Sequence, residues 1–213
     1  MELKHYSTIT EILPKDSKLI AVSKGQEAEK IRALYKEGHR DFGENFLQEL
    51  QQKKAELPKD IRWHFLGNIQ SNKLKEISSC SYLIQSISRK KIYQKLLTLD
   101  SKNITNVLLQ LKLGVEESKS GFSKEEIYQI IDQHPSDSHM IIKGLMVIAE
   151  GNKSHSQIKE QFDFAFEVYK KIKSLNKNIE ILSMGMSNDF NIALEAGSNM
   201  IRIGTSLFGE RYK

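Results

Sequence analysis

Short apolar runs alternate with longer polar segments along the chain. The runs cover residues 19–23, 41–43, 63–66, 82–85, 107–113, 140–148, 179–184 and 200–203. Continuous apolar runs of this kind are typical of strands that are buried on both faces, as in a parallel sheet. Because parallel strands need a crossover connection, which is usually a helix, we expect a helix after most of these runs.

The segments after the first two runs carry helical periodicity. Apolar residues share one helix face at Ala28, Ile31, Leu34 and Tyr35. Gly38 follows at a position that suits a helix stop. After the second run, Phe46, Leu47 and Leu50 share a face in the same way, and Pro58 ends the unit. Two amphipathic helices are therefore predicted before the third strand.

Two further helices are predicted in the second half of the chain. A long one is marked by apolar positions at Ile158, Phe162, Ala165, Tyr169 and Ile172. A shorter one runs through Ile192 and Leu194 and is closed by Gly197. Ser187 is the expected N-cap of this shorter helix, since a serine oxygen accepts a hydrogen bond from the first free amides of a helix.

The alternation of strands and helices predicts an α/β fold with a parallel sheet. Eight strand candidates favour a closed (β/α)8 TIM barrel, and 213 residues lie at the short end of the range of about 200 or more for that fold. An open, doubly wound sheet is the alternative. The chain has no linker rich in glycine, serine or proline, so we expect residues 1–213 to form a single domain.

The charge of the chain is mildly positive. Lys and Arg number 32 against 27 Asp and Glu, which gives a formal net charge of +5. The excess is spread as single lysines, with no arginine-rich run and no cluster of aromatic and basic residues. This charge excess is the only feature that supports a nucleic-acid-binding function. A mildly positive field is also compatible with the attraction of a small anionic ligand.

Cysteine usage and hydropathy bear on the compartment. Cys80 is the single cysteine, so no internal disulfide forms, and a reducing compartment, the cytoplasm, is expected. Residues 1–6 have no apolar core of the kind that a signal peptide requires. No stretch of about 18 apolar residues occurs, so no membrane partner is expected.

Lys24 stands at the end of the first apolar run, and Gly25 follows it directly. The carboxyl ends of barrel strands are where such folds place their chemistry. A partly desolvated amine there can form a Schiff base with a carbonyl compound. The alternative is a strand-end lysine whose ammonium simply reaches water.

The last two predicted strands offer groups for an anion. In residues 200–205, side chains alternate, so Arg202 points into the barrel if its isoleucine neighbours pack on the helices. A buried arginine needs a fixed partner. Gly204 and Thr205 then offer close backbone approach and a hydroxyl. Residues 183–187 add Gly185 and a helix N-terminus, which favours an anion, although both segments also suit ordinary turns.

Taken together, these groups fit one ligand. An aldehyde matches Lys24, a phosphate matches the loops after the last two strands, and a ring nitrogen matches Arg202. Pyridoxal 5′-phosphate (PLP) carries all three, and an arginine or an acid at the ring nitrogen is an expected partner of that cofactor.

The motifs at these positions also resemble a known family over nearly the whole chain. They are residues 21–24 (AVSK), 41–45 (DFGEN) with 48–49 (QE), 63–67 (WHFLG) with 70–73 (QSNK), 117–122 (ESKSGF), 144–146 (GLM), 182–187 (LSMGMS), and 202–205 (RIGT) with 208–209 (FG). Their order and spacing are similar to those of the pyridoxal phosphate homeostasis proteins, the YggS/PROSC-like family, which is like the N-terminal domain of alanine racemase.

The resemblance implies a PLP fold type III barrel without the C-terminal β domain of alanine racemase. It implies that Lys24 carries PLP as a Schiff base and that Arg202 faces the pyridine nitrogen. It implies further cofactor contacts at Asn45, His64, Ser183, Gly185, Met186, Gly204 and Thr205. In that set, Ser183, Gly204 and Thr205 hold the phosphate, helped by backbone amides around Gly185 and Met186.

The resemblance also implies a role in vitamin B6 homeostasis, as a carrier or regulator of PLP without robust catalysis. The alternative is a PLP-dependent amino-acid racemase, which needs a second acid or base opposite Lys24. We expect a monomer that makes transient contact with PLP-dependent apo-enzymes, and Lys119 is a candidate docking site for PLP. The six histidines are scattered, so no metal is expected. Lys112 departs from the family pattern and is a candidate to enter the pocket.

Overall fold

The computed structural model describes residues 4–100, 103–114 and 120–209 and has a closed barrel at its centre. The strands are β1 (Lys18–Val22), β2 (Asp41–Glu44), β3 (Arg62–Phe65), β4 (Leu83–Ile87), β5 (Thr105–Leu111), β6 (Met140–Val147), β7 (Ile181–Ser183) and β8 (Met200–Ile203). The helices are α1 (Lys4–Ile12), α2 (Ala28–Lys36), α3 (Leu47–Glu56), α4 (Leu74–Cys80), α5 (Lys90–Leu97), α6 (Lys124–Gln133), α7 (His155–Leu175), α8 (Phe190–Glu195) and α9 (Thr205–Phe208), with a 3-10 turn η1 (Ser71–Lys73).

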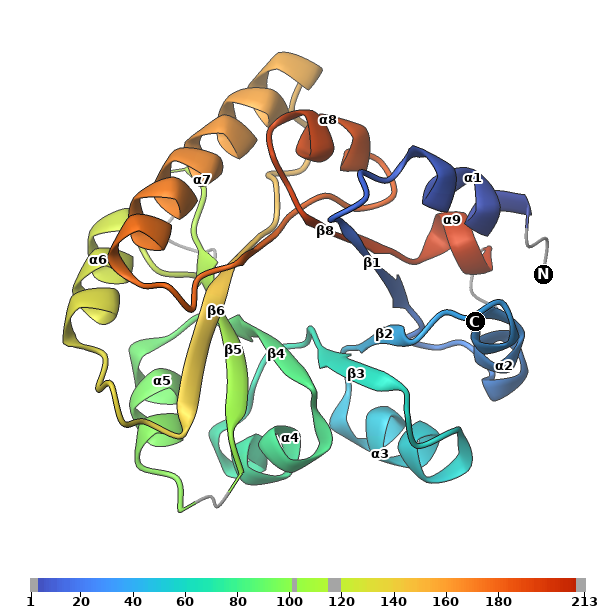
Figure 1. Cartoon of the computed structure of the whole chain (residues 1–213), viewed down its shortest axis with the longest axis horizontal. Coiled ribbons are helices and arrows are strands. Elements are labelled where there is room, and N and C mark those ends of the chain that lie inside the picture. Colours follow the sequence, from blue (N-terminus) through green and yellow to red (C-terminus); the bar gives the residue numbers. More distant parts are fainter. Residues whose placement is uncertain (1–3, 101–102, 115–119, 210–213) are drawn as a thin grey trace.

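Each strand pairs in parallel with the next one in the chain, and β8 pairs with β1 to close the ring. The helices surround this ring on the outside (Figure 1). The (β/α)8 barrel predicted from the sequence is therefore confirmed, and the open doubly wound sheet is excluded. In the described part of the chain, no helix is both long and apolar enough to cross a membrane.

Strand boundaries shift by a residue or two from the apolar runs. Lys18 and Arg62 begin β1 and β3, although both side chains are charged. The reason is that pairing uses the backbone, while a long basic side chain can lie along the barrel end and expose its charge. Each of the eight apolar runs overlaps one of the eight strands.

The predicted long helix is α7, and its first turn is closed by reciprocal hydrogen bonds. The hydroxyl of Ser154 accepts from the amide of Gln157, and the side chain of Gln157 accepts from the amide of Ser154. Phe162, Ala165 and Ile172 are buried against the barrel, as their spacing predicts.

Two details of the helix predictions are wrong. Phe46 does not pack with Leu47, because α3 begins at Leu47 and leaves the Phe46 side chain 65% exposed. Ser187 is not an N-cap, since α8 begins at Phe190 and the side chain of Asp189 accepts a hydrogen bond from the backbone of Met186 at 2.6 Å. Phe46 is extended and precedes α3, whereas residues 187–189 form a turn before α8; apolar spacing alone reveals neither feature.

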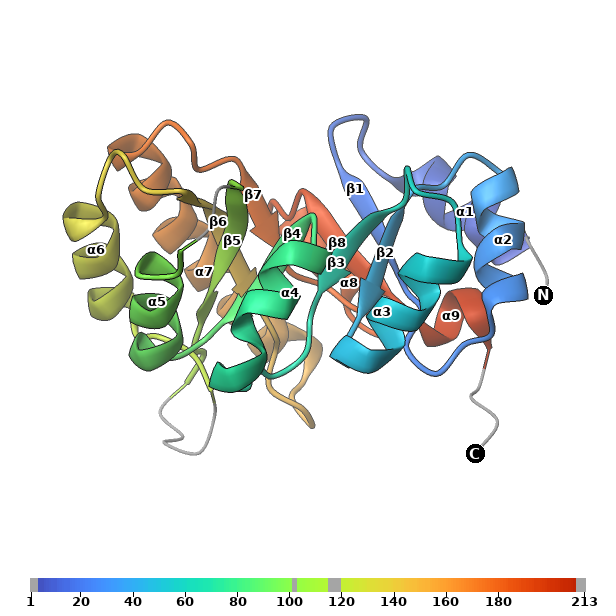
Figure 2. The same cartoon turned by 90° about the horizontal axis from the view of Figure 1, so that it is seen from below.

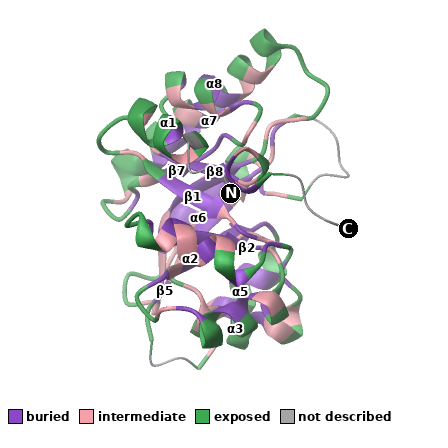
Figure 3. Cartoon of the chain, turned by 90° about the vertical axis from the view of Figure 1, so that its right-hand side faces the viewer, coloured by how far each residue is buried: buried purple, intermediate pink, exposed green. Residues whose placement is uncertain are grey.

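The apolar core has two parts, one outside and one inside the barrel wall. The outer part lies between strands and helices and includes Ile201 and Ile203 of β8. The inner part is small and consists of Ile20, Leu83, Leu108, Met146 and Met200. Figure 3 shows the buried strands surrounded by helices whose outer faces are exposed. Polar side chains fill the rest of the interior, and buried polar groups of this kind need partners.

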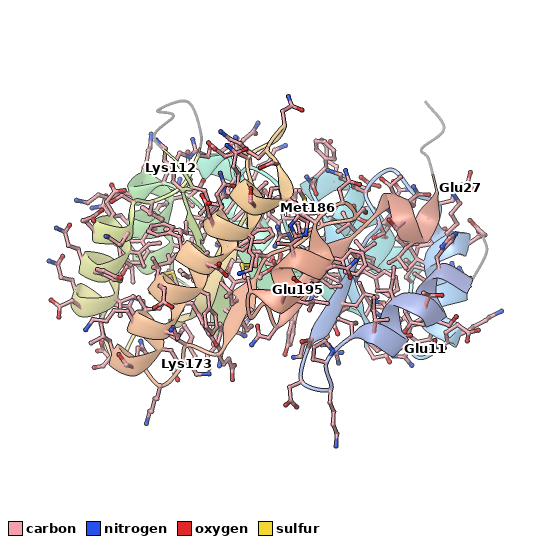
Figure 4. All side chains as sticks on the ribbon, turned by 90° about the horizontal axis from the view of Figure 1, so that it is seen from above. Glu11, Glu27, Lys112, Lys173, Met186 and Glu195 are labelled. Carbon is pink, nitrogen blue, oxygen red and sulfur yellow. The ribbon has the colours of Figure 1, made fainter. Side chains whose placement is uncertain are left out.

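The two ends of the barrel can be told apart in the side views. Figure 2 shows the strands running between the two ends with helices along them. In Figure 4, Glu27, Lys112 and Met186, which all follow strands, lie towards one edge of the molecule, while Glu11 and Lys173, which precede strands, lie towards the other. The edge with Met186 is the carboxyl end of the strands, where barrels of this class carry their sites.

Candidate functional site

A cavity of about 650 Å³ lies at the carboxyl end of the barrel. Its lining includes six residues expected from the sequence, namely Lys24, Asn45, Met186, Arg202, Gly204 and Thr205. They come from the ends of β1, β2, β7 and β8, so the closure of the ring brings together residues up to 181 positions apart, the interval between Lys24 and Thr205.

Lys24 and Asn45 leave the barrel at the same level. The register of β1 with β2 places Val22 opposite Gly43, and each of the two lining residues follows two positions later. Lys24 is only half-buried. The strand pairing thus presents an amine and an amide side by side on one wall of the cavity.

Arg202 supplies a fixed cation at the cavity. It is buried at 5% exposure, and it points into the barrel as the alternation along β8 predicts. Its Nη1 donates to Ser183 Oγ and its Nη2 to the carbonyl of Val147, both at 2.8 Å. Burial lowers the pKa of Arg202 to about 10, against the opposing influence of Asp189, so the guanidinium stays charged at neutral pH.

A line of hydrogen bonds continues from Arg202 through the barrel interior. The hydroxyl of Ser183 donates to Gln85 Oε1 at 2.7 Å, and Gln85 Nε2 lies 3.1 Å from His64 Nδ1. His64 Nε2 in turn lies 3.0 Å from Asp41 Oδ1. Because an amide nitrogen can only donate, Nδ1 is the acceptor and His64 carries its proton on Nε2. Burial also lowers the pKa of His64, which keeps the ring neutral.

The line ends at an ion pair near the amino end of the strands. Burial opposes ionisation of Asp41, but hydrogen bonds from Arg62 and His64 outweigh it and hold the pKa of Asp41 well below its usual range. Arg62 donates to both carboxylate oxygens, and its own side chain is 42% exposed. The interior line therefore joins the cavity to the opposite end of the barrel.

Three of the expected cofactor contacts, Ser183, His64 and Gly185, are not among the residues that line the cavity. Ser183 and His64 are buried in the interior line, one and three hydrogen bonds away from Arg202. Their side chains point inward as expected, but at a lower level of the barrel. Gln85 and Asp41 are members of the same line that sequence reasoning missed. The signal for them was a polar residue within an otherwise apolar strand.

The loop after β7 is shaped by Gly185. Its φ of +98° belongs to the region that favours glycine, and a Cβ there would lie 2.6 Å from the Cβ of Ala193. The amide of Met186, expected to face a phosphate, already donates to Asp189. At this side of the cavity, Ser187, Gly204 and Thr205 complete the lining.

Other candidates lie apart from this cavity. Lys112 lines a neighbouring hollow of about 250 Å³ with Ser120 and Ile148, and it does not share the lining with Lys24. Lys119 lies outside the described residues. Across the described ranges, no group of three or more His, Cys, Asp or Glu residues is arranged to hold a metal ion.

Comparison with known proteins identifies the class. The family model for the alanine racemase N-terminal domain matches residues 3–212. A pyridoxal phosphate homeostasis protein of Pseudomonas aeruginosa is 37% identical over 196 residues, which cover 91% of this chain and 84% of that protein. The one from Synechocystis is 36% identical over 214 residues and covers 97% of each chain. The chain is thus a barrel protein of the alanine racemase N-terminal domain class.

Solved structures agree with this class. PipY of Synechococcus elongatus without PLP superposes with a TM-score of 0.92 at 32% identity, covering 98% of this chain and 100% of that one. PipY with PLP bound gives a TM-score of 0.89 at 32% identity, with 97% and 99% covered. The chain belongs to the pyridoxal phosphate homeostasis protein family.

Proposed function

We propose that this protein binds PLP in the cavity at the carboxyl end of the barrel and takes part in intracellular PLP homeostasis. The observation that carries the proposal is the meeting of Lys24, Arg202 and Thr205 in one cavity of about 650 Å³. They supply a primary amine, a fixed cation and a hydroxyl. Those are the partners required by an aldehyde, a ring nitrogen and a phosphate.

The residues of the cavity fit the cofactor in kind. PLP supplies an aldehyde, which Lys24 holds as a Schiff base. Arg202 is fixed by Ser183 and Val147, so it presents its guanidinium as a donor that keeps a facing ring nitrogen unprotonated. Gly204 leaves the backbone open beside Thr205, whose hydroxyl is exposed to a phosphate in the cavity.

The phosphate-binding site that we propose differs from the one expected from the sequence. The Met186 amide is engaged by Asp189, and the Ser183 hydroxyl is engaged by Gln85 and Arg202. Of the groups expected to hold the phosphate, Thr205 and the backbone around Gly204 remain at the cavity. Gly185 contributes through the shape of its loop.

The proposal extends to the partners of the protein. Ile148 and Met186 line the cavity and remain 46% and 38% exposed, which supports transient contact with PLP-dependent apo-enzymes around its mouth. We propose a monomer, because residues of one chain, within the part that the structure describes, line the cavity from β1, β2, β7 and β8. The single cysteine, Cys80, supports a cytoplasmic location.

The test is the visible absorption spectrum of purified protein with added PLP, followed by borohydride reduction and peptide mass mapping. We expect a visible band that disappears on reduction, with the cofactor fixed on Lys24. Lys24→Ala should abolish the band, whereas Lys153→Ala, at another wall of the same cavity, should keep it. A spectrum without a band at saturating PLP would overturn the proposal.

Turnover is tested separately. The holo-protein is incubated with L-alanine, and the optical activity of the solution is followed. We expect no change over hours at micromolar protein. Loss of optical activity that depends on Lys24 would replace the carrier role with that of a racemase.

A further inference from the structure

A cluster of buried charges lies behind Lys24, on the outer side of the barrel wall. Gly43 of β2 faces the interior, since a Cβ there would meet the side chain of Ile20. Glu44, the next residue, therefore points outward towards α3 and is 0% exposed. Lys53 of α3 meets it there at only 6% exposure. Lysine is rarely buried to this extent unless it is paired.

The ammonium of Lys53 uses all of its hydrogen-bonding capacity in this cluster. It donates to Glu44 Oε1 at 2.8 Å and to Glu49 Oε1 at 2.6 Å. It also donates to the backbone carbonyl of Ser23 at 2.6 Å. An ammonium has three donors, and these three contacts account for them.

The same two carboxylates hold the residues on either side of Lys24. Glu44 Oε1 accepts from the hydroxyl of Ser23 at 2.6 Å. Glu49 Oε1 accepts from the amide of Gly25 at 2.5 Å. Both chain neighbours of Lys24 are thus attached to one rigid helix through side chains that converge on Lys53.

This attachment is needed because the chain turns sharply after Lys24. Gly25 has a φ of +67° and is exposed. Water alone would not fix the direction of its backbone amide, whereas the Glu49 carboxylate does. A buried ion cluster is a costly way to gain stability, since well-packed apolar residues of the same size serve equally well. It does, however, fix the position and direction of a backbone segment to which it is hydrogen-bonded.

We propose that Lys53, together with Glu44 and Glu49, is a positioning residue for Lys24, and that it holds the lysine-bearing turn in the place where the amine meets the cofactor. The inference rests on the proposed function for its purpose. The clamp itself is a property of the protein without cofactor and is measured there.

The first experiment compares Lys53→Met with Lys54→Met. Methionine keeps the apolar stem of lysine and removes the ammonium. Lys54 is the adjacent lysine on α3, and its amine bonds to the carbonyl of Cys80 on the α4 side, away from the Lys24 turn. Hydrogen–deuterium exchange of peptides that cover residues 19–27 is measured in cofactor-free protein. We expect exchange at the turn to rise roughly tenfold in Lys53→Met, as for the loss of a charge-assisted hydrogen bond, and to stay unchanged in Lys54→Met.

A second readout is the rate at which Lys24 takes up PLP. The visible band should form roughly tenfold more slowly in Lys53→Met at equal PLP, while the final band should remain on Lys24 after borohydride reduction. Unchanged exchange together with an unchanged rate in folded Lys53→Met would overturn the inference. Failure of wild-type protein to bind PLP would instead overturn the proposed function, and the exchange data would still decide whether the clamp exists.

A milder pair of variants covers the case in which Lys53→Met does not fold. Glu49 is more accessible than the other two members, with 23% of its side chain exposed. Glu49→Gln keeps an oxygen that accepts from Gly25, whereas Glu49→Ala removes it. We expect faster exchange at the turn in Glu49→Ala and near wild-type exchange in Glu49→Gln. Equal exchange in Glu49→Ala and wild type would overturn the inference.

Discussion

Arg202 Nη1 donates to Ser183 Oγ at 2.8 Å, and the hydroxyl proton of Ser183 is directed away from it towards Gln85. The Ser183 hydroxyl therefore accepts a hydrogen bond from the guanidinium of Arg202 and donates one to the side-chain amide of Gln85. A buried donor that is held in this way has its direction fixed before any ligand arrives. Ser183 acts on the cavity through Arg202.

Ser183→Ala should loosen Arg202 without removing its charge. We expect PLP affinity to fall about five- to tenfold, the size of one hydrogen bond to a charged group, together with a shift of the visible band of the bound cofactor. Equilibrium titration and absorption spectroscopy measure both. Ser78→Ala, which removes a hydroxyl bonded to Thr105 far from the cavity lining, is the matched control and should change neither quantity.

Gln85→Leu should destabilise the fold by about 2–4 kcal/mol, because two buried partners lose their hydrogen bonds at once. These are the hydroxyl of Ser183 and the Nδ1 of His64. Urea unfolding followed by circular dichroism gives the free energy. Gln94→Leu, at the surface of α5, serves as the comparison and should stay within about 0.5 kcal/mol of wild type. Equal stability of the two variants would show that the interior line is not structural.

Glu44 should make stability depend on pH. Burial raises the pKa of Glu44 to about 7 from its ordinary value of 4.5, against the opposing charge of Lys53. Between these two values the folded protein holds a proton that the unfolded chain has released. The free energy of unfolding therefore contains a term that falls as pH rises from 4.5 to 7.

Glu44→Gln removes the titratable carboxyl group, so the free energy of unfolding should fall less steeply between pH 4.5 and 7 than in wild type. Urea unfolding at a series of pH values measures the slope for the variant and for wild type. Glu56→Gln, whose side chain is 48% exposed, should leave the wild-type slope intact. A slope in Glu44→Gln as steep as in wild type would show that Glu44 titrates normally.

Gly185→Ala should be costly. The new Cβ would lie 2.6 Å from the Cβ of Ala193, and the backbone keeps a φ of +98°. We expect a loss of about 2 kcal/mol or more from the strained backbone and the overlap. Gly151→Ala is the control, because a Cβ there meets nothing within 4 Å. Thermal unfolding of both variants separates the two cases, and equal midpoints would contradict the strain.

The sequence predicted the barrel because its information is local and repeated. Each strand is marked by an apolar run, and each predicted helix is marked by apolar residues that recur at helical spacing on one face. For Arg202, alternation along one strand was enough to predict an inward side chain, and the structure places it there. The same reasoning could not say how deep an inward side chain lies. Depth depends on the stagger between strands, and the structure places Ser183 and His64 in the interior line and not in the cavity lining.

The burial of charged residues on helices could not be predicted from the sequence either. Lys53 follows two glutamines and precedes a second lysine, so the segment has the composition of a solvated helix face. Its burial is decided by β2, where Glu44 points outward, and by the approach of α3 to the end of β1. Contacts between segments that are far apart in sequence do not leave a local pattern.

The interior line has a direction. From Arg202 to Asp41, each group donates to the next, so the bond dipoles add up instead of cancelling. The interior line thus has a cation, Arg202, at the cavity and an anion, the Asp41 carboxylate that is paired with Arg62, at the far end. Neutral groups between them transmit the polarisation. A ring nitrogen that accepted a hydrogen bond from Arg202 at the cavity would therefore interact with the whole interior line and extend it by one hydrogen bond.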